Sequence, residues 1–323
     1  MKTRVTENYS EVGLGAWQLG ADWGNVSEDD AHAILQTAAD NGVTFIDTAD
    51  VYGAGLSETR IGKFISTYPK GSFFVATKLG RLHGYPDQYS LQLFRKCVQD
   101  SIKRLQVDKL NLVQLHCVPT QVLQKGEVFD WLRTLKKEGL IENFGASVES
   151  TKEARICLQQ DGLYSLQIIF NIYRQSPISE IFSEAQAKGV RLIVRLPLAS
   201  GLLSGRFDEK TVFPEDDHRN YNRDGAVFNV GETFAGLPYD KAVTLTKRLQ
   251  DIVKDQEQSM SSLAIRWVLD HPAISVVIPG ATKIEQVRKN AAASQHDSLA
   301  KDLHQTLKRF FYDEVQQYIR GPV

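Results

Sequence analysis

Short hydrophobic runs alternate with longer amphipathic stretches along the whole chain. The runs are Val12–Ala16, Val43–Ile46, Phe73–Thr77, Leu110–Leu115, Asn143–Ala146, Leu166–Phe170, Arg191–Val194 and Ser275–Ile278. They are rich in β-branched residues and lack the apolar–polar alternation of a strand with one wet face. Each is therefore predicted to be a strand buried on both faces, as in a parallel sheet covered by helices.

The stretches between these runs begin with signals typical of helix N-termini. Ser27 precedes three acidic residues, which suit the positive end of a helix dipole. Ser150 and Glu153 have capping-box spacing, and Ser176 followed by Pro177 predicts an N-cap and a first helical residue. We expect a helix to follow each of these positions.

About eight strand–helix repeats predict an α/β fold, a (β/α)₈ TIM barrel formed as a single domain by residues 1–323. The alternative is an open doubly wound sheet, which normally carries a GxGxxG fingerprint after its first strand. The glycines of Gly13–Gly20 lack that spacing, and no helical pattern follows them. The barrel is therefore the favoured fold.

Two segments depart from the repeat. A long polar segment from Gly205 to about Tyr239 follows the seventh strand, so it is expected at the barrel mouth as a lid or substrate loop. Leu299–Gln317 is amphipathic and is expected to form an extra C-terminal helix on the outside.

Charge and composition exclude several functions. The formal net charge of −1 creates no strong field toward nucleic acid or a membrane surface. No apolar run approaches the roughly 20 residues of a membrane span, and the first residues do not resemble a secretory signal. Three cysteines show neither zinc-site nor disulfide spacing. These features predict a cytoplasmic protein with small-molecule partners; its oligomeric state is not indicated.

Four polar residues fall where predicted strands end. Asp47 ends the second strand, Tyr52 lies in the loop after it, Lys78 ends the third strand and His116 ends the fourth. Barrel enzymes place their chemistry at this rim. An ammonium lowers the pKa of a nearby phenol, a carboxylate keeps the ammonium charged, and an imidazole can orient a carbonyl. Each residue alone has an ordinary structural explanation, but together they predict acid–base catalysis by Tyr52.

The chain resembles an aldo-keto reductase over essentially its whole length. The motifs that carry the resemblance are GLGAWQLG, FIDTADVYG, ATKLGR, LVQLHC, PLASGLLSGRF and VVIPGATKIEQVRKN. The resemblance implies hydride transfer between a nicotinamide and a carbonyl compound or alcohol, without a metal. It makes Asp47, Tyr52, Lys78 and His116 the catalytic tetrad, with Trp17 and Trp23 as candidate walls of the substrate pocket.

The same resemblance implies the cofactor residues. The pyrophosphate loop would comprise Leu198, Ser200, Gly201, Leu202, Ser204 and Arg206; the adenosine end would comprise Gly280, Ala281, Thr282, Lys283, Gln286 and Asn290. Ser147 and Gln167, with Asn171 as a weaker candidate, would hold the carboxamide. Lys283 as a partner for a 2′-phosphate favours NADP(H) over NAD(H).

Two positions depart from the family pattern. Val148 stands where an asparagine usually follows the serine, and Arg195 stands where an aromatic residue often stacks on the nicotinamide. We expect an altered grip on the cofactor, or a role for Arg195 toward an anionic substrate group.

Other functions are weighed against the reductase. A Schiff-base enzyme would need a desolvated, neutral Lys78, which Asp47 opposes. The histidines lack metal-ligand spacing. An NADP(H)-binding redox-sensing or regulatory subunit with little turnover is the main alternative. The polar residues 217–236 suit a hydroxylated or anionic substrate, such as a sugar-like aldehyde.

Overall fold

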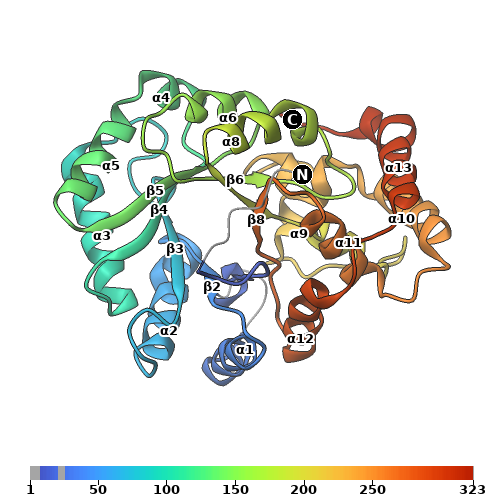
Figure 1. The fold of residues 1–323 in the computed structure, drawn as a ribbon, viewed down its shortest axis with the longest axis horizontal. Coiled ribbons are helices and arrows are strands. Elements are labelled where there is room, and N and C mark those ends of the chain that lie inside the picture. Colours follow the sequence, from blue (N-terminus) through green and yellow to red (C-terminus); the bar gives the residue numbers. More distant parts are fainter. Residues whose placement is uncertain (1–7, 21–25, 323) are drawn as a thin grey trace.

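A computed structural model of the chain describes residues 8–20 and 26–322. Its eight strands form one parallel sheet in sequence order (Figure 1). They are β1 (Leu14–Gly15), β2 (Phe45–Asp47), β3 (Phe74–Leu79), β4 (Leu110–His116), β5 (Ile141–Ser147), β6 (Ser165–Ile169), β7 (Arg191–Arg195) and β8 (Ile274–Val277). All eight predicted strands are confirmed, although β1 is shorter than expected and several ends shift by one or two residues.

The sheet closes between its first and last strands. Val12 pairs with Val277 and Gly15 with Gly280, both in parallel. The backbone nitrogen of Gly13 donates to the carbonyl of Val277 at 2.8 Å. The chain therefore forms the predicted (β/α)₈ barrel, with the carboxyl ends of its strands at one mouth.

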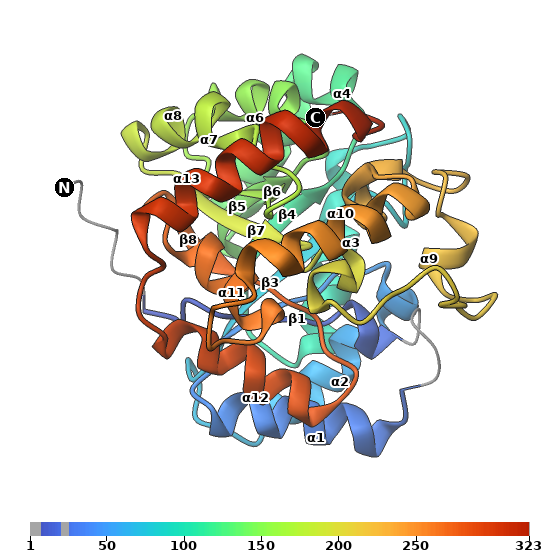
Figure 2. The same cartoon turned by 90° about the vertical axis from the view of Figure 1, so that its right-hand side faces the viewer.

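Helices surround this barrel (Figures 1 and 2). They are α1 (Glu28–Asp40), α2 (Leu56–Ile65), α3 (Leu91–Leu105), α4 (Thr120–Lys125), α5 (Glu127–Lys137), α6 (Thr151–Leu158), α7 (Pro177–Glu180), α8 (Phe182–Ala187), α9 (His218–Tyr221), α10 (Tyr239–Val253), α11 (Met260–Leu269), α12 (Ile284–Ala292) and α13 (Lys301–Phe310). In the described ranges, none of them is long and apolar enough to cross a membrane.

The hydrophobic core has two layers. A small cluster, including Phe45, Leu112 and Ile193, fills the barrel interior. A much larger one fills the space between the sheet and the helices. Both faces of the strands are thus buried, which explains why the sequence lacks alternation.

The helix signals are confirmed in part. The Ser27 hydroxyl accepts from the Asp30 nitrogen at 3.0 Å, and that of Ser150 accepts from Glu153 at 3.2 Å. The reciprocal bond of a capping box is missing, because the Glu153 carboxylate accepts from the nitrogen of Glu149. Ser176 takes the predicted N-cap position and Pro177 begins α7, but Ser176 has helical dihedral angles and its side chain makes no capping bond.

The segment between β7 and α10 is long and mostly irregular, as predicted. It contains α9 and three 3₁₀ turns, Ala199–Ser204, Val230–Glu232 and Phe234–Gly236. It extends to one side of the barrel (Figure 2). The extra C-terminal helix is α13, which lies outside the barrel and continues into a π-helical turn, Phe311–Val315, and a 3₁₀ turn, Gln316–Tyr318.

Close contact between β5 and β6 depends on Gly145. A Cβ at this position would lie 2.3 Å from the hydroxyl oxygen of Ser165 and 2.6 Å from its carbonyl oxygen. The two residues are register partners, and the same pairing sets Ser147 beside Gln167 at the barrel mouth. A side chain here would push the two strands apart.

We expect Gly145→Ala to reduce the free energy of unfolding by about 1–3 kcal/mol, because it overpacks the strand pair. Thermal unfolding would show a lower Tm. Ser165→Ala alone should cost little, since its buried hydroxyl has no hydrogen-bond partner among the described residues. In that background Gly145→Ala should cost less, because the clash with the hydroxyl is gone and only the one with the backbone carbonyl remains, and equal costs in both backgrounds would refute a contribution from the hydroxyl.

Candidate active site

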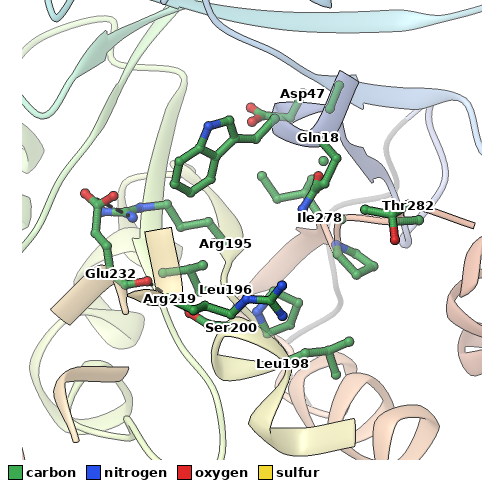
Figure 3. A pocket seen from close by; sticks show the side chains of 18 of the residues that line it. Gln18, Asp47, Arg195, Leu196, Leu198, Ser200, Arg219, Glu232, Ile278 and Thr282 are labelled. Carbon is green, nitrogen blue, oxygen red and sulfur yellow. Dashed lines mark hydrogen bonds and ion pairs between the residues drawn. The ribbon is translucent and has the colours of Figure 1, made fainter. Parts of the chain in front are cut away.

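A cavity of about 600 Å³ opens at the carboxyl ends of the strands (Figure 3). Its volume is typical of a site for a cofactor and a small substrate. Its lining includes Asp47, Tyr52 and His116 as well as Thr282 and Asn290. The cavity thus links the predicted chemical centre to the predicted adenosine end.

A buried ion pair lies beneath the inner end of this cavity. The Lys78 Nζ lies 2.5 Å from Asp47 Oδ1, with side-chain exposures of 0% and 4%. The same ammonium donates to the backbone carbonyl of Thr48 at 2.7 Å. The amide groups of Gln167 and Gln114 donate to Asp47 Oδ2 at 2.7 and 3.4 Å. Buried charges need such partners, because desolvation alone is costly.

Tyr52 lies directly over this pair. Its hydroxyl oxygen is 3.3 Å from Lys78 Nζ, and its ring stacks on Trp17 with centroids 5.9 Å apart. A Cβ on Gly20 would lie 2.6 Å from the carbonyl carbon of Tyr52, and one on Gly53 would lie 2.3 Å from the oxygen of Gly20. Backbone contact through two glycines therefore fixes the loop that carries Tyr52.

The protonation states follow from burial and charge. Burial lowers the pKa of Lys78, but the charges and hydrogen bonds of Asp47 and Tyr52 together outweigh burial, so the pKa is raised and the ammonium is retained. Burial raises the pKa of Asp47, against the opposing effects of Lys78 and the two amides. The pKa of Tyr52 is also raised, because burial outweighs the neighbouring ammonium. The expected lowering by Lys78 is present, but it does not dominate, and Tyr52 remains a protonated phenol at neutral pH.

His116 completes the group. It lines the cavity, and its ring meets that of Tyr52 edge-on at 5.8 Å. Burial, with the charges of Lys78, Arg81 and Arg195, holds its pKa well below the usual range. A neutral imidazole can donate one hydrogen bond to a carbonyl oxygen.

The structure brings most of the predicted cofactor residues to one cavity. Those that line it are Ser147, Gln167, Leu198, Ser200, Gly201, Ser204, Arg206, Gly280, Ala281, Thr282, Gln286 and Asn290. The backbone is left-handed at Ala199, Ser200 and Gly201, so the chain turns sharply along the cavity wall. Such turns form concave surfaces that suit phosphate oxygens.

Some predicted residues lie elsewhere. Leu202 is fully buried and does not line the cavity, and Asn171 binds the carbonyl of Leu196 through its amide. Lys283 is exposed at the start of α12, outside the lining. Trp17 lines the cavity, whereas Trp23 lies outside the described residues.

Several lining residues were missed by sequence reasoning. Lys289 lines the cavity together with Gln286 and Asn290, which were predicted to belong to the adenosine end. Residues three and four apart share a helix face, so the spacing on α12 could have indicated Lys289. Arg81, Arg219 and Glu232 also line the cavity, but they come from loops whose paths the sequence does not predict.

The two departures from the family pattern meet in space. Arg195, at the end of β7, donates from Nη2 to the carbonyl of Val148 at 3.1 Å. Its Nη1 lies 3.5 Å from Glu232 Oε1, and Figure 3 shows these two side chains facing each other. Arg195 is thus part of a charged wall of the cavity.

The barrel, the tyrosine–lysine–aspartate–histidine group and the elongated cavity beside it define a barrel oxidoreductase. The aldo/keto reductase family model matches residues 11–310. The chain therefore belongs to the aldo/keto reductase family.

Individual relatives agree with this assignment. The aldo-keto reductase YhdN of Bacillus subtilis is 27% identical, over 97% of this chain and 94% of its own length. The holo form of aldo-keto reductase AKR11C1 from Bacillus halodurans superposes with a TM-score of 0.76 at 26% identity, covering 96% of this chain and 95% of that one. An aldo-keto reductase from Klebsiella pneumoniae, solved with NADPH, shares the fold at 21% identity with a TM-score of 0.70 and 96% coverage of both chains.

Removing the charge of Asp47 tests the ion pair. In Asp47→Asn, burial would lower the pKa of Lys78 against Tyr52 alone, so the ammonium would be lost at lower pH. We expect the high-pH limb of the kcat profile to move to lower pH, with kcat reduced about 10²-fold at pH 8. Steady-state kinetics from pH 5 to 10 measure this.

Asp108→Asn is the matched control, since Asp108 forms a fully solvated pair with Lys70. Its pH profile should match that of the wild type. An unshifted profile in folded Asp47→Asn would contradict the role given to Asp47.

Proposed function

We propose that this protein is an NADP(H)-dependent oxidoreductase that interconverts an aldehyde or ketone and the corresponding alcohol. The observation that carries the proposal is the Tyr52 hydroxyl, 3.3 Å from the Lys78 ammonium and on the wall of a cavity that reaches the predicted nucleotide residues. The preferred cofactor is NADP(H) rather than NAD(H).

The residues along the cavity fit a dinucleotide phosphate. Ser200, Gly201 and Arg206 would hold the pyrophosphate, and Ser147 and Gln167 would hold the carboxamide. Lys289 and Asn290 line the opposite end, where Lys289 suits a 2′-phosphate better than Lys283. NADPH is the ligand of the Klebsiella pneumoniae relative. The bound nicotinamide would supply or accept the hydride.

The side chains of the tetrad would then move the proton. In reduction, the Tyr52 phenol donates its proton to the carbonyl oxygen, and in oxidation the phenolate takes the proton back. Lys78 stabilises the phenolate, and Asp47 keeps Lys78 charged. His116, neutral and donating one hydrogen bond, orients the carbonyl oxygen toward Tyr52.

The substrate is a small carbonyl compound, and a sugar-like aldehyde is one candidate. Polar residues surround the reacting end, while Trp17 and Phe228 supply apolar walls. The ring centroids of these two aromatic residues lie 6.2 Å apart. This combination suits a molecule with both polar groups and a hydrophobic face.

Tyr52→Phe tests the proposal. The substitution removes the proton donor and keeps the ring that stacks on Trp17, so NADPH affinity should stay within about twofold while kcat falls by about 10²–10⁴-fold. Tryptophan fluorescence titration measures the first quantity, and the decrease in NADPH absorbance with a carbonyl panel measures the second.

Trp131→Phe, a change on the outer helix α5, serves as the control and should leave both quantities unchanged. If Tyr52→Phe turned over at the wild-type rate, Tyr52 would not be the proton donor. Tight NADPH binding by the wild type without turnover across the panel would instead favour a redox-sensing subunit.

A further inference from the structure

A second charged group lies in the wall of the same cavity. Arg81, in the loop after β3, and Arg195, at the end of β7, each have an Nη1 atom 3.5 Å from Glu232 Oε1. Glu232 comes from the long segment after β7. All three side chains line the cavity, beside His116 and Tyr52.

The contacts of these arginines are loose. The buried ion pairs between Lys78 and Asp47, at 2.5 Å, and between Arg104 and Glu58, at 2.6 Å, are shorter. One carboxylate oxygen of Glu232 is shared by two guanidinium groups. Within the part of the chain that the structure describes, the buried Nε of Arg195 has no hydrogen-bond partner. Each guanidinium has five N–H donors, so the pair retains donors for a further acceptor.

Behind Glu232 lies a second carboxyl group. A carboxylate oxygen of Glu149, one of Glu232 and the Sγ of Cys117 lie within 4.8 Å of one another. Two carboxylates this close repel each other, which favours the state in which one of them holds a proton. Burial, followed by the charge of Glu232, raises the pKa of Glu149 to about 7, whereas the pKa of Glu232 is lowered.

The charges around Glu149 come from several elements. The charged side chains that act on Glu149 are those of Glu232, Arg195, Arg81, Glu153 and Arg174. The Cys117 thiol adds no charge, because burial raises its pKa to about 12. The three guanidinium groups and the carboxylates of Glu232 and Glu153 have a net charge of +1 while Glu149 is protonated. The net charge falls to zero once Glu149 ionises. Such a group repels a metal cation and attracts an anion.

We propose that Arg81 and Arg195 form a carboxylate-recognition subsite, which selects carbonyl substrates that carry a carboxylate group, and that the Glu149–Glu232 pair controls its strength. A guanidinium binds a planar carboxylate through two parallel hydrogen bonds. One spare charge matches a monoanion better than a phosphate dianion. The proposal rests on the proposed function only in calling the bound molecule a substrate.

An isosteric pair of aldehydes tests the subsite. Binding of 4-carboxybenzaldehyde and of its neutral analogue 4-formylbenzamide is measured by calorimetry with saturating NADP⁺, which has no hydride to give. At pH 6 we expect the carboxylate to bind at least about tenfold more tightly. Arg195→Gln and Arg81→Gln should each remove most of that preference, with the amide affinity held within about twofold.

Arg95→Gln is the matched control, because Arg95 pairs with Glu138 on the surface; it should keep the preference. Equal binding of the two aldehydes by the wild type, or an undiminished preference in both arginine variants, would overturn the subsite. Tighter binding of 4-formylphenyl phosphate would overturn the assignment to carboxylates. Because binding is measured without turnover, these outcomes are separate from the fate of the proposed reductase.

The pH dependence tests the carboxyl pair. Glu149 is neutral below pH 7 and charged above it, so wild-type affinity for 4-carboxybenzaldehyde should fall about fivefold between pH 6 and pH 8. Affinity for the amide should not change. Glu149→Gln imitates the neutral form of Glu149 at every pH, so the affinity of this variant for 4-carboxybenzaldehyde should stay constant over this range. A fall of the same size in Glu149→Gln would refute control by this pair.

Discussion

The buried contact between Lys78 and Asp47 is the interaction on which the rest of the site depends. Both charges are removed from water, and an ion pair in that position is stable only if its remaining hydrogen-bonding capacity is satisfied. The partners come from β2, β3, β4 and β6 through Asp47, Lys78, Gln114 and Gln167. The pair therefore requires the closed barrel, because only closure brings these four strands around one point.

The second charged group contrasts with the first in how it is held. Lys78 and Asp47 are held by strands in fixed register, whereas Glu232 is supplied by the long segment after β7. That segment is itself held from outside: the Arg320 guanidinium donates to the carbonyl of Gly236 at 3.0 Å and contacts Asp224 at 2.7 Å. The Lys78–Asp47 pair is thus held by the barrel strands, whereas the charged wall formed by Arg81, Arg195 and Glu232 is held partly by a loop. Loops positioned by a rigid scaffold are where specificity usually lies.

The sequence was most informative where local patterns determine structure. Continuous apolar runs identified all eight strands, and the position of Asp47, Lys78 and His116 at strand ends was enough to place them at one mouth. The support for Asp47 from Gln167 was not predictable, since 120 residues separate the two and only the stagger of the strands joins them. The meeting of Arg81 and Glu232 depends likewise on the path of a long loop. Lys289 was missed because the segment was interpreted as a linear motif rather than as one face of a helix.

The state of Tyr52 shows why pairwise reasoning from sequence needs the burial that only a fold supplies. An ammonium next to a phenol favours the phenolate, and that effect is present here. The Tyr52 phenol is enclosed, however, and burial penalises its charged form more strongly than Lys78 stabilises it. The resting group is therefore the protonated phenol, which in the proposed reaction would give its proton to a carbonyl oxygen. In that reaction the ammonium would act chiefly after transfer, when a phenolate needs a counter-charge. Burial and Lys78 thus favour opposite states of the same proton, which suits a group that must both release it and recover it.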